Sequence, residues 1–268
     1  MIQALPPLDY EALRGDLVRF IRDEFRRTGM ERGILGLSGG LDSALVAHLA
    51  VDALGAERVS AVAMPYRDSS PESLAHAKRV AEATRLEFSV REITPMVDPY
   101  FADEPEASAL RRGNKMARER MSILYDLSAV QGALVLGTSN KSEICLGYGT
   151  AFGDLACAIN PIGDLYKTHV RGLSRHLGVA EEILNKAPSA DLWAGQSDEE
   201  ELGFGYDEVD PLLFRMVDEN WDRQALIEAG WSADFVDRVG DLYRGSEFKR
   251  RMPLIADLSG HRADGQSG

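Results

Sequence analysis

The chain has 268 residues, 44% of them hydrophobic and 27% charged, so it is long enough to bury a sizeable core as one large domain. Its net charge of −13 argues against nucleic acid as the main partner, and no apolar run approaches the roughly 20 residues that span a bilayer. The two cysteines, Cys145 and Cys157, form no CxxC motif and suit a reducing compartment. We therefore expect a cytoplasmic protein that binds neither nucleic acid nor membrane.

Apolar segments that alternate with helical patterns organise the first half of the chain. Residues 9–28 predict an amphipathic helix whose apolar stripe belongs to the core or to a subunit interface. The apolar pattern predicts strands at residues 33–37, 58–64, 86–93 and 133–138, with helices between them. This alternation predicts an α/β fold, with a doubly wound, mostly parallel sheet and flanking helices.

Irregular stretches and short helices make up much of the remainder. Residues 98–113 predict an exposed loop before a helix from Asn114 to Val130, and residues 186–211 predict a second irregular stretch. Helical patterns at residues 207–220, 222–229 and 232–245 predict a short C-terminal helical region. We expect residues 1–256 to form a single domain and residues 257–268 to form a disordered tail.

A glycine-rich segment follows the first predicted strand and opens the next helix. Its sequence is Gly36-Leu37-Ser38-Gly39-Gly40-Leu41-Asp42-Ser43. A turn between a strand and a helix directs free backbone N–H groups and the positive end of the helix dipole at an anion. The adjacent glycines allow close approach of the backbone, the two serines add hydroxyl groups, and Asp42 can hold a metal ion. The segment therefore predicts a phosphate-binding loop.

Three known loop types compete for this segment. A Walker A loop is excluded because it needs a lysine that the segment lacks. A Gly-x-Ser-x-Gly nucleophile elbow fits residues 36–40, but a serine hydrolase also needs a histidine base, and no histidine of the chain is placed like one. The third type is the Ser-Gly-Gly-x-Asp-Ser loop of enzymes that split ATP into AMP and pyrophosphate.

A second group of polar residues follows the fourth predicted strand, from Thr138 to Glu143. Carboxyl ends of parallel strands meet at one edge of a sheet, so we expect Gly36–Ser43, Met64–Arg67 and Thr138–Glu143 to converge. Glu143 and Asp42 would then place two carboxylates beside one phosphate site, which is a usual arrangement for Mg²⁺. Taken on its own, the segment is better explained as a helix cap.

The order of the motifs resembles that of the NAD synthetases, which are a family within the PP-loop ATP pyrophosphatases. The resemblance spans roughly residues 30–252. Besides the glycine loop, the matching segments are Arg118–Met121, Gly137–Glu143, Asn160–Thr168, Pro188–Trp193, Gln196–Gly203 and Phe248–Arg251. The Leu-Tyr-Lys-Thr segment and the acidic loop make the resemblance specific, whereas the glycine loop alone indicates only the wider group.

The resemblance implies an adenine nucleotide alpha hydrolase-like fold and a ligase reaction. Mg-ATP would adenylate the nicotinate carboxylate of deamido-NAD, and ammonia would displace AMP to give NAD. Carried over to this chain, residues 36–43 would hold the pyrophosphate group, and Asp42 and Glu143 would hold Mg²⁺. Thr138, Lys167 and Ser189 would contact ATP, with Asp42, Lys167 and Glu143 as the catalytic set.

The implied site for deamido-NAD departs from the family pattern at three positions. Arg120 and Lys249 would contact deamido-NAD. However, Ala151 and Ala158 stand where many members carry a lysine and an aspartate near the pyridine end of the dinucleotide, and Phe248 replaces a common histidine. The resemblance therefore leaves recognition of the nicotinate ring open.

The resemblance also bears on partners. No segment can supply the glutamine-hydrolysing domain of longer relatives, so the implied nitrogen donor is free ammonia, unless a separate glutamine amidotransferase delivers it. A homodimer is implied, with the residue 9–28 stripe and the helix from Asn114 as candidate contact surfaces. Two alternatives remain: an ATP pyrophosphatase that amidates or thiolates another acceptor, and a nucleotide sensor without catalysis.

Overall fold

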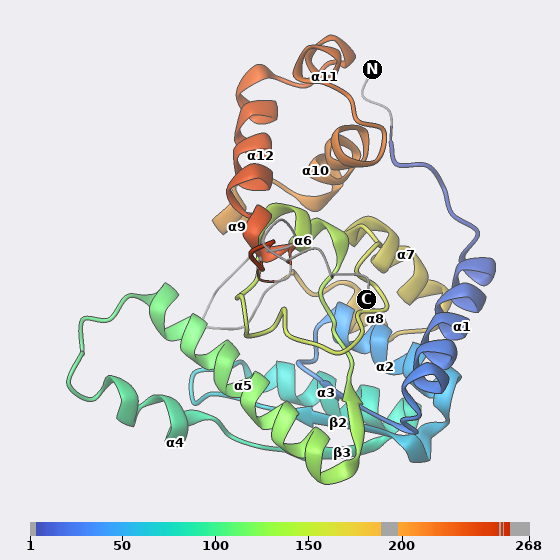
Figure 1. Ribbon diagram of the computed structural model, residues 1–268, viewed down its shortest axis with the longest axis vertical. Coiled ribbons are helices and arrows are strands. Elements are labelled where there is room, and N and C mark those ends of the chain that lie inside the picture. The colour runs from blue at the N-terminus through green and yellow to red at the C-terminus, as the bar shows by residue number, and fades with distance from the viewer. Residues whose placement is uncertain (1–3, 189–197, 252, 254, 258–268) are drawn as a thin grey trace, which may run out of the picture.

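The computed structural model describes residues 4–188, 198–251, 253 and 255–257. Four strands form one sheet, with helices on both of its faces (Figure 1). The elements in chain order are α1 (Tyr10–Thr28), β1 (Arg32–Gly36), α2 (Leu41–Leu54), η1 (Ala56–Arg58), β2 (Val59–Ala63), α3 (Pro71–Thr84), β3 (Glu87–Val90), α4 (Thr94–Val97), η2 (Pro99–Phe101), α5 (Ala109–Gln131), β4 (Ala133–Val135), α6 (Lys141–Leu146), α7 (Lys167–His176), α8 (Glu181–Leu184), α9 (Asp198–Leu202), α10 (Tyr206–Leu213), η3 (Phe214–Asp218), α11 (Arg223–Ala229), α12 (Ala233–Gly245) and η4 (Glu247–Lys249).

The sheet is parallel throughout, in the order β3-β2-β1-β4. The central strands β1 and β2 are largely buried, whereas β3 at the edge is mostly exposed. Burial on both faces explains why β1 and β2 read as continuous apolar runs in the sequence. The predicted α/β fold with a doubly wound parallel sheet is therefore confirmed.

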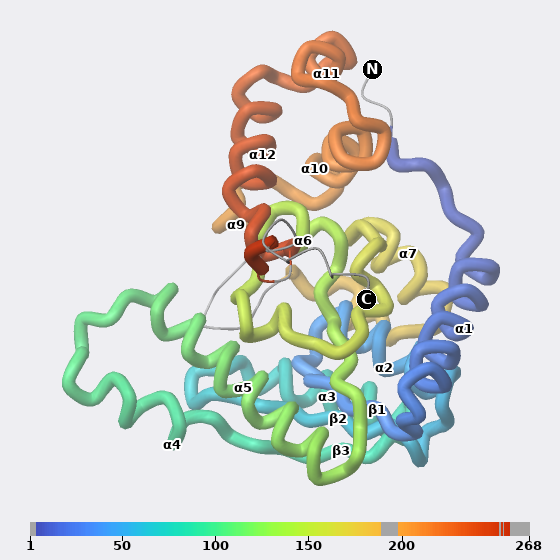
Figure 2. Tube along the Cα trace, in the orientation of Figure 1, coloured from blue at the N-terminus to red at the C-terminus, as the bar shows by residue number. Residues whose placement is uncertain are grey.

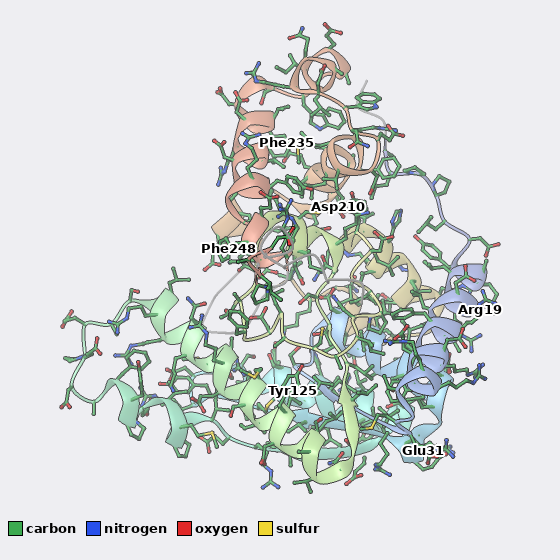
Figure 3. The ribbon with its side chains drawn as sticks, viewed as in Figure 1. Arg19, Glu31, Tyr125, Asp210, Phe235 and Phe248 are labelled. Carbon is green, nitrogen blue, oxygen red and sulfur yellow. The ribbon has the colours of Figure 1, made fainter. Side chains whose placement is uncertain are left out.

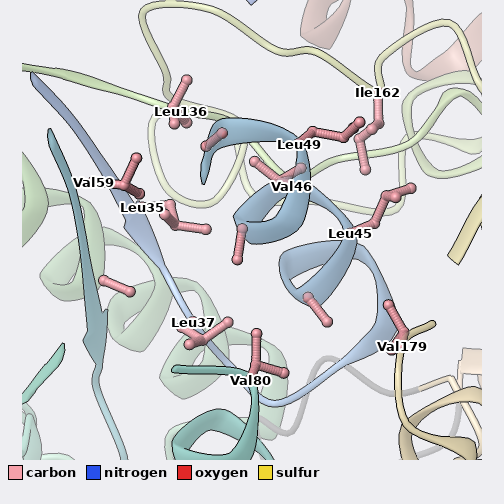
Figure 4. Close-up of a cluster of buried hydrophobic side chains, with 14 of the residues drawn as sticks. Leu35, Leu37, Leu45, Val46, Leu49, Val59, Val80, Leu136, Ile162 and Val179 are labelled. Carbon is pink, nitrogen blue, oxygen red and sulfur yellow. The ribbon is translucent and has the colours of Figure 1, made fainter. Parts of the chain in front are cut away.

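Alternate residues of β1 point to two different hydrophobic clusters. Leu35 belongs to a cluster with α1, α2, α3 and α7, whereas its neighbour Ile34 belongs to a cluster with α4 and α5. Figure 4 shows the first cluster, in which Leu45 and Leu49 of α2 lie near Ile162, on the side of the helix away from Leu35 and Val59 of the strands. This alternation is the two-residue period of a strand, and it fixes which helices cover which face.

A third hydrophobic cluster holds the C-terminal helical region together. Figure 1 shows α9–α12 gathered at one end of the molecule, beyond α6. Their apolar side chains pack with those of α6 around Tyr206, Val209 and Trp231. Figure 2 shows the chain before α1 running along this region, where Leu5 packs against the cluster and the carbonyl oxygen of Pro6 lies 3.1 Å from Nε2 of His169.

Several predicted boundaries were right because local caps mark them. Helix α1 begins after Asp9, whose side chain accepts two backbone N–H groups, and it ends at Gly29 in the left-handed conformation. Most of its apolar stripe packs against α2 and α7 and is therefore core, whereas Phe20 is 40% exposed. In the described part of the chain, no helix is long and apolar enough to cross a membrane.

Two predictions about irregular stretches were wrong. Residues 98–113 contain η2 and the start of α5, because Ser108 caps a helix that begins at Ala109 rather than at Asn114. Residues 186–211 contain α9 and the first residues of α10. The predicted strand at 86–93 is shorter, and residues 207–220 divide into α10 and a π-helical turn, η3. Most of the predicted tail lies outside the described residues, and the single-domain boundary stays a prediction.

The α2 core can be tested by shortening one side chain. Leu45 is fully buried in the cluster around α2. We expect Leu45→Ala to lower the free energy of unfolding by about 2–5 kcal/mol, because it leaves a cavity in a packed core. Urea unfolding measures this change. Val130→Ala is the control, because Val130 is 76% exposed and its truncation should change the value by less than about 0.5 kcal/mol. Equal losses in both variants would contradict the assigned core.

Candidate active site

A cavity of about 500 Å³ lies at the carboxyl ends of the strands. The ends of β1, β2 and β4 all contribute to it, as the sequence predicted. Its lining includes these predicted site residues: Gly36, Leu37, Ser38, Gly40, Leu41, Asp42, Ser43, Arg120, Thr138, Glu143, Lys167 and Lys249. Gly39 belongs to the same loop, where its backbone packs against Ser73 of α3. Ser189 lies outside the described residues.

The glycine loop presents its backbone to this cavity. Gly39 has φ of +79°, and a Cβ atom at this position would lie 2.0 Å from the carbonyl oxygen of Ser73. Only glycine fits this left-handed position against α3. Gly40 caps α2 without a side-chain hydrogen bond, so the first N–H groups of α2 have no capping side chain. Such a helix start suits an anion.

The two serines of the loop hold its shape. The Oγ atoms of Ser38 and Ser43 are 3.1 Å apart, and the Ser43 hydroxyl donates to the carbonyl oxygen of Gly40 at 3.0 Å. The Ser38 hydroxyl also accepts the N–H of Gly40. In the described residues that line the cavity there is no histidine, so a Ser38 nucleophile would have no histidine base there. The geometry therefore disfavours the hydrolase alternative.

A buried lysine joins the two carboxylates that the sequence singled out. Nζ of Lys167 lies 2.5 Å from Oδ2 of Asp42 and 3.2 Å from Oε1 of Glu143. The Lys167 side chain is 5% exposed, and each carboxylate side chain is 16% exposed. Asp42 and Glu143 both lie in the first turn of their helices, α2 and α6, so the two helix starts bring them together.

Asn140 completes this group by bonding to both carboxylates. Its Nδ2 donates to Oδ1 of Asp42 at 2.9 Å, and its backbone N–H donates to Oε2 of Glu143 at 3.2 Å. The Asn140 side chain in turn accepts the backbone N–H of Glu143, which forms a capping box for α6. The capping role was expected from the sequence, whereas the bond across to Asp42 was not.

Burial and charge compete at this group. Burial disfavours the charged form of Lys167, but the charges of Asp42 and Glu143 outweigh it and raise the pKa of Lys167. Burial raises the pKa of Glu143 to about 8, Lys167 opposes this rise, and Asp42 and Asp198 add to it. Even with Lys167 beside it, Glu143 therefore tends to hold its proton at neutral pH, and a further cation would favour its ionised form.

The carboxylate pair is a chemically suitable partner for Mg²⁺. Asp42 and Glu143 converge on one point, which an ammonium group approaches in this structure. Mg²⁺ is commonly bound by one or two carboxylates, with phosphate oxygens and water completing its shell. Within the described ranges there is no cluster of three or more His, Cys, Asp or Glu side chains placed to hold a metal, so the protein alone would supply only part of that shell.

Asp210 supports this group from the C-terminal helical region. It lies fully buried in α10, near the junction with α6 and α7 (Figure 3). Its carboxylate accepts the Ser142 hydroxyl at 2.5 Å and both the N–H and the hydroxyl of Thr168, while the Ser142 hydroxyl accepts the N–H of Lys167. Asp210 thus fixes residues adjacent to Glu143 and Lys167. No local motif marks it, so the sequence analysis missed it.

Basic residues line the cavity beyond the carboxylates. Arg120 donates to the carbonyl oxygen of Met64 at 3.0 Å, which ties α5 to the end of β2. Lys249 donates to the carbonyl oxygens of Gly147 and Gly149, both at 2.8 Å. Because α5 begins at Ala109, Arg120 lies well inside this helix and not near its start.

The three residues that depart from the family pattern lie outside the lining. Ala151 is half-buried and Ala158 is exposed, and within the described chain neither residue lines the cavity. Phe248 is 68% exposed near the end of α12 (Figure 3). The backbone oxygen of Ala151 accepts hydrogen bonds from Arg118. Nothing in this geometry explains the two alanines.

Comparison with known proteins decides the family. The NAD synthase family profile matches residues 13–253. The NH(3)-dependent NAD(+) synthetase of Trichlorobacter lovleyi is 57% identical over 257 residues, which are 96% of this chain and 94% of that protein. The chain belongs to the NAD synthase family.

Solved structures of the family share the fold. NH3-dependent NAD synthetase from Campylobacter jejuni is 34% identical, with a TM-score of 0.80 over 93% of this chain and 100% of that one. NMN synthetase from Francisella tularensis is 31% identical, with a TM-score of 0.84 over 94% of this chain and 100% of that one. The resemblance noted in the sequence is thereby confirmed at the level of family and fold.

The close packing of Gly39 gives a first test of the loop. We expect Gly39→Ala to abolish nucleotide binding, because an alanine at positive φ is strained and its Cβ would overlap the carbonyl oxygen of Ser73. Gly40→Ala is the matched control, because φ at Gly40 is −87° and the nearest atom to its Cβ would be the Ser38 hydroxyl, at 3.2 Å. Titration with a fluorescent ATP analogue measures both variants. Equal binding by the two variants would contradict the assigned loop geometry.

The shared cation gives a second test. We expect Lys167→Met to lower the free energy of unfolding by about 3–5 kcal/mol, because two buried carboxylates lose their common partner. Mg²⁺ should restore part of this loss, because it can bind between the same carboxylates. Urea unfolding with and without Mg²⁺ measures both effects.

The control for this test removes an exposed ion pair instead. Arg223 donates to both carboxylate oxygens of Asp237 at the surface, so Arg223→Met should cause a small loss of stability that Mg²⁺ does not change. If Mg²⁺ stabilised neither variant, or both variants equally, Asp42 and Glu143 would not be the metal site.

Proposed function

We propose that the chain catalyses the ATP-dependent amidation of deamido-NAD by ammonia, giving NAD, AMP and pyrophosphate. Membership of the NAD synthase family supports this proposal, and relatives are named NH(3)-dependent NAD(+) synthetases. The observation that carries it is the Asp42–Lys167–Glu143 group beside the glycine loop, in a cavity that also reaches Arg120 and Lys249. A triphosphate and the remainder of a dinucleotide could then share one cavity.

The first step joins the two substrates. The nicotinate carboxylate oxygen attacks the α-phosphorus of ATP, an acyl-adenylate forms, and the bond to pyrophosphate breaks. The backbone N–H groups of residues 36–43 would donate hydrogen bonds that stabilise the negative charge developing on the leaving pyrophosphate. Asp42 and Glu143 would hold Mg²⁺, which when bound neutralises phosphate charge. Lys167, fixed by both carboxylates, and Thr138 would orient the phosphates.

The second step introduces nitrogen. Ammonia attacks the acyl carbon, the bond to AMP breaks, and one proton leaves to give the amide. Arg120 and Lys249 line the same cavity as Lys167, where they would orient deamido-NAD. Little covalent chemistry falls to the protein, so positioning and charge stabilisation would supply most of the rate.

We further propose a cytoplasmic homodimer with ammonia as its nitrogen donor. Most of the apolar stripe of α1 packs in the chain's own core, which favours α5 as the contact surface of the two considered. Leu110 and Tyr125 of α5 are exposed apolar side chains that such a contact could cover. A separate glutamine amidotransferase would be needed only if free ammonium does not suffice.

A coupled assay tests the proposed reaction. Purified protein is incubated with Mg-ATP, deamido-NAD and ammonium, and NAD is read by dehydrogenase reduction and AMP by chromatography. We expect NAD and AMP in equal amounts, with no product when glutamine replaces ammonium. A parallel reaction contains nicotinate mononucleotide, whose amidation gives NMN, because the Francisella relative is named NMN synthetase. AMP formation with only the mononucleotide, or no AMP at all, would contradict deamido-NAD as the acceptor.

A pair of variants on one helix links the assay to the site. Asp42→Asn should lower NAD formation by about 100-fold or more, because it removes a charge from the phosphate site. Asp52→Asn is the matched control, because Asp52 lies near the other end of α2, where it pairs with Arg14. An Asp42→Asn variant that retained full activity would show that Asp42 is not part of the machinery.

A further inference from the structure

The cavity contains a deficit of positive charge at the phosphate end. The Asp42–Lys167–Glu143 group supplies no net positive charge, because one ammonium is shared between two carboxylates: the group is neutral when Glu143 is protonated and has a net charge of −1 when both carboxylates are ionised. The glycine loop adds only backbone N–H groups and hydroxyls. If the proposed function holds, a triphosphate binds here and a pyrophosphate leaves, so a further cation near the loop would stabilise both.

Lys186 is a cation close to the loop. It follows α8, is half-buried and lines the cavity together with Ser38, Gly40 and Ser43. Its Nζ donates to the Ser73 hydroxyl at 2.8 Å. Ser73 is buried in the first turn of α3, and its carbonyl oxygen is the atom against which Gly39 packs. One residue thus contacts both the ammonium group and the back of the phosphate loop.

The ammonium group of Lys186 is available to bind an anion. Across the described residues, no carboxylate lies within ion-pair distance of it, and its hydrogen bond is to a neutral hydroxyl. The other cations of the cavity are engaged elsewhere: Lys167 with two carboxylates, Arg171 with Asp207 at 3.6 Å, and Arg120 and Lys249 with backbone carbonyl oxygens. A lysine with a flexible stem and no anionic partner is well placed to bind phosphate.

We propose that Lys186 binds the pyrophosphate portion of ATP. Its ammonium group reaches from Ser73 to the phosphates held by the loop and offsets the charge that develops on the leaving pyrophosphate. Lys167 and Lys186 then have different tasks, because Lys167 fixes the carboxylates that would hold Mg²⁺, whereas Lys186 supplies net positive charge to the leaving group.

A binding measurement that needs no turnover tests this proposal. Inorganic pyrophosphate with Mg²⁺ is titrated into the full chain and followed by calorimetry. We expect Lys186→Met to weaken binding by about 10- to 100-fold, the usual worth of one charge-assisted hydrogen bond. Lys186→Arg keeps the positive charge and should recover much of the affinity. Because Lys186 is half-buried at the cavity wall, these variants should fold, and thermal unfolding verifies that they do.

A lysine on the surface of α3 provides the matched control. Lys78 is exposed on the same helix as Ser73 and does not line the cavity as far as the described residues define it, so Lys78→Met should bind pyrophosphate as the unaltered chain does. Wild-type affinity in a folded Lys186→Met, or equal weakening in Lys78→Met, would overturn the proposal. A purely structural role for Lys186 would predict lost stability with pyrophosphate affinity unchanged.

Steady-state kinetics separate the two substrates. In the coupled assay, Lys186→Met should raise KM for Mg-ATP and weaken product inhibition by pyrophosphate, both by about 10-fold or more. KM for deamido-NAD should stay within about twofold, since Lys186 lies at the phosphate end. An increase in KM for deamido-NAD alone would overturn the assignment. If the unaltered chain formed no NAD, the proposed function would fail, yet the pyrophosphate titration would still decide the role of Lys186.

Discussion

The site depends on one buried ion group, in which the ammonium of Lys167 lies between the carboxylates of Asp42 and Glu143. Burying two carboxylates is costly unless a cation and hydrogen-bond donors meet them, and Lys167 and Asn140 provide both. The three charged residues come from three helix starts, those of α2, α6 and α7. Satisfying these charges therefore fixes how the three helices stand relative to one another at the phosphate-binding edge.

Topology explains why residues so distant in the sequence can meet. In a parallel sheet every strand ends at the same edge, so the topology alone brings the loops after β1, β2 and β4 together there. The C-terminal helical region then covers one side of that edge, and the fully buried carboxylate of Asp210 ties it to α6 and α7. Two hydrophobic clusters, one around α2 and one around Tyr206, are thus joined by polar contacts beside the site.

The sequence predicted the sheet, the phosphate loop and the pairing of Asp42 with Glu143, because each follows from a local pattern plus the rule that parallel strands share an edge. It could not predict contacts that depend on the packing of distant elements. Asp210 and Lys186 carry no motif of their own, and Asn140 looks like an ordinary cap until its bond to Asp42 is seen. The early start of α5 was missed because proline and acidic residues precede it, yet Ser108 alone suffices as its cap.

The contacts of Lys249 have a consequence for how the protein is made. Lys249 and Arg250 donate to the carbonyl oxygens of Gly147, Gly149 and Cys145, and so fasten the segment that forms one wall of the cavity. The four strands and the phosphate loop lie far before Lys249 and Arg250 in the sequence. Nascent chains acquire structure from the N-terminus onward. During synthesis, the sheet can therefore form before the hydrogen bonds from Lys249 and Arg250 hold the cavity wall in place. The site becomes complete only after residue 250 has left the ribosome.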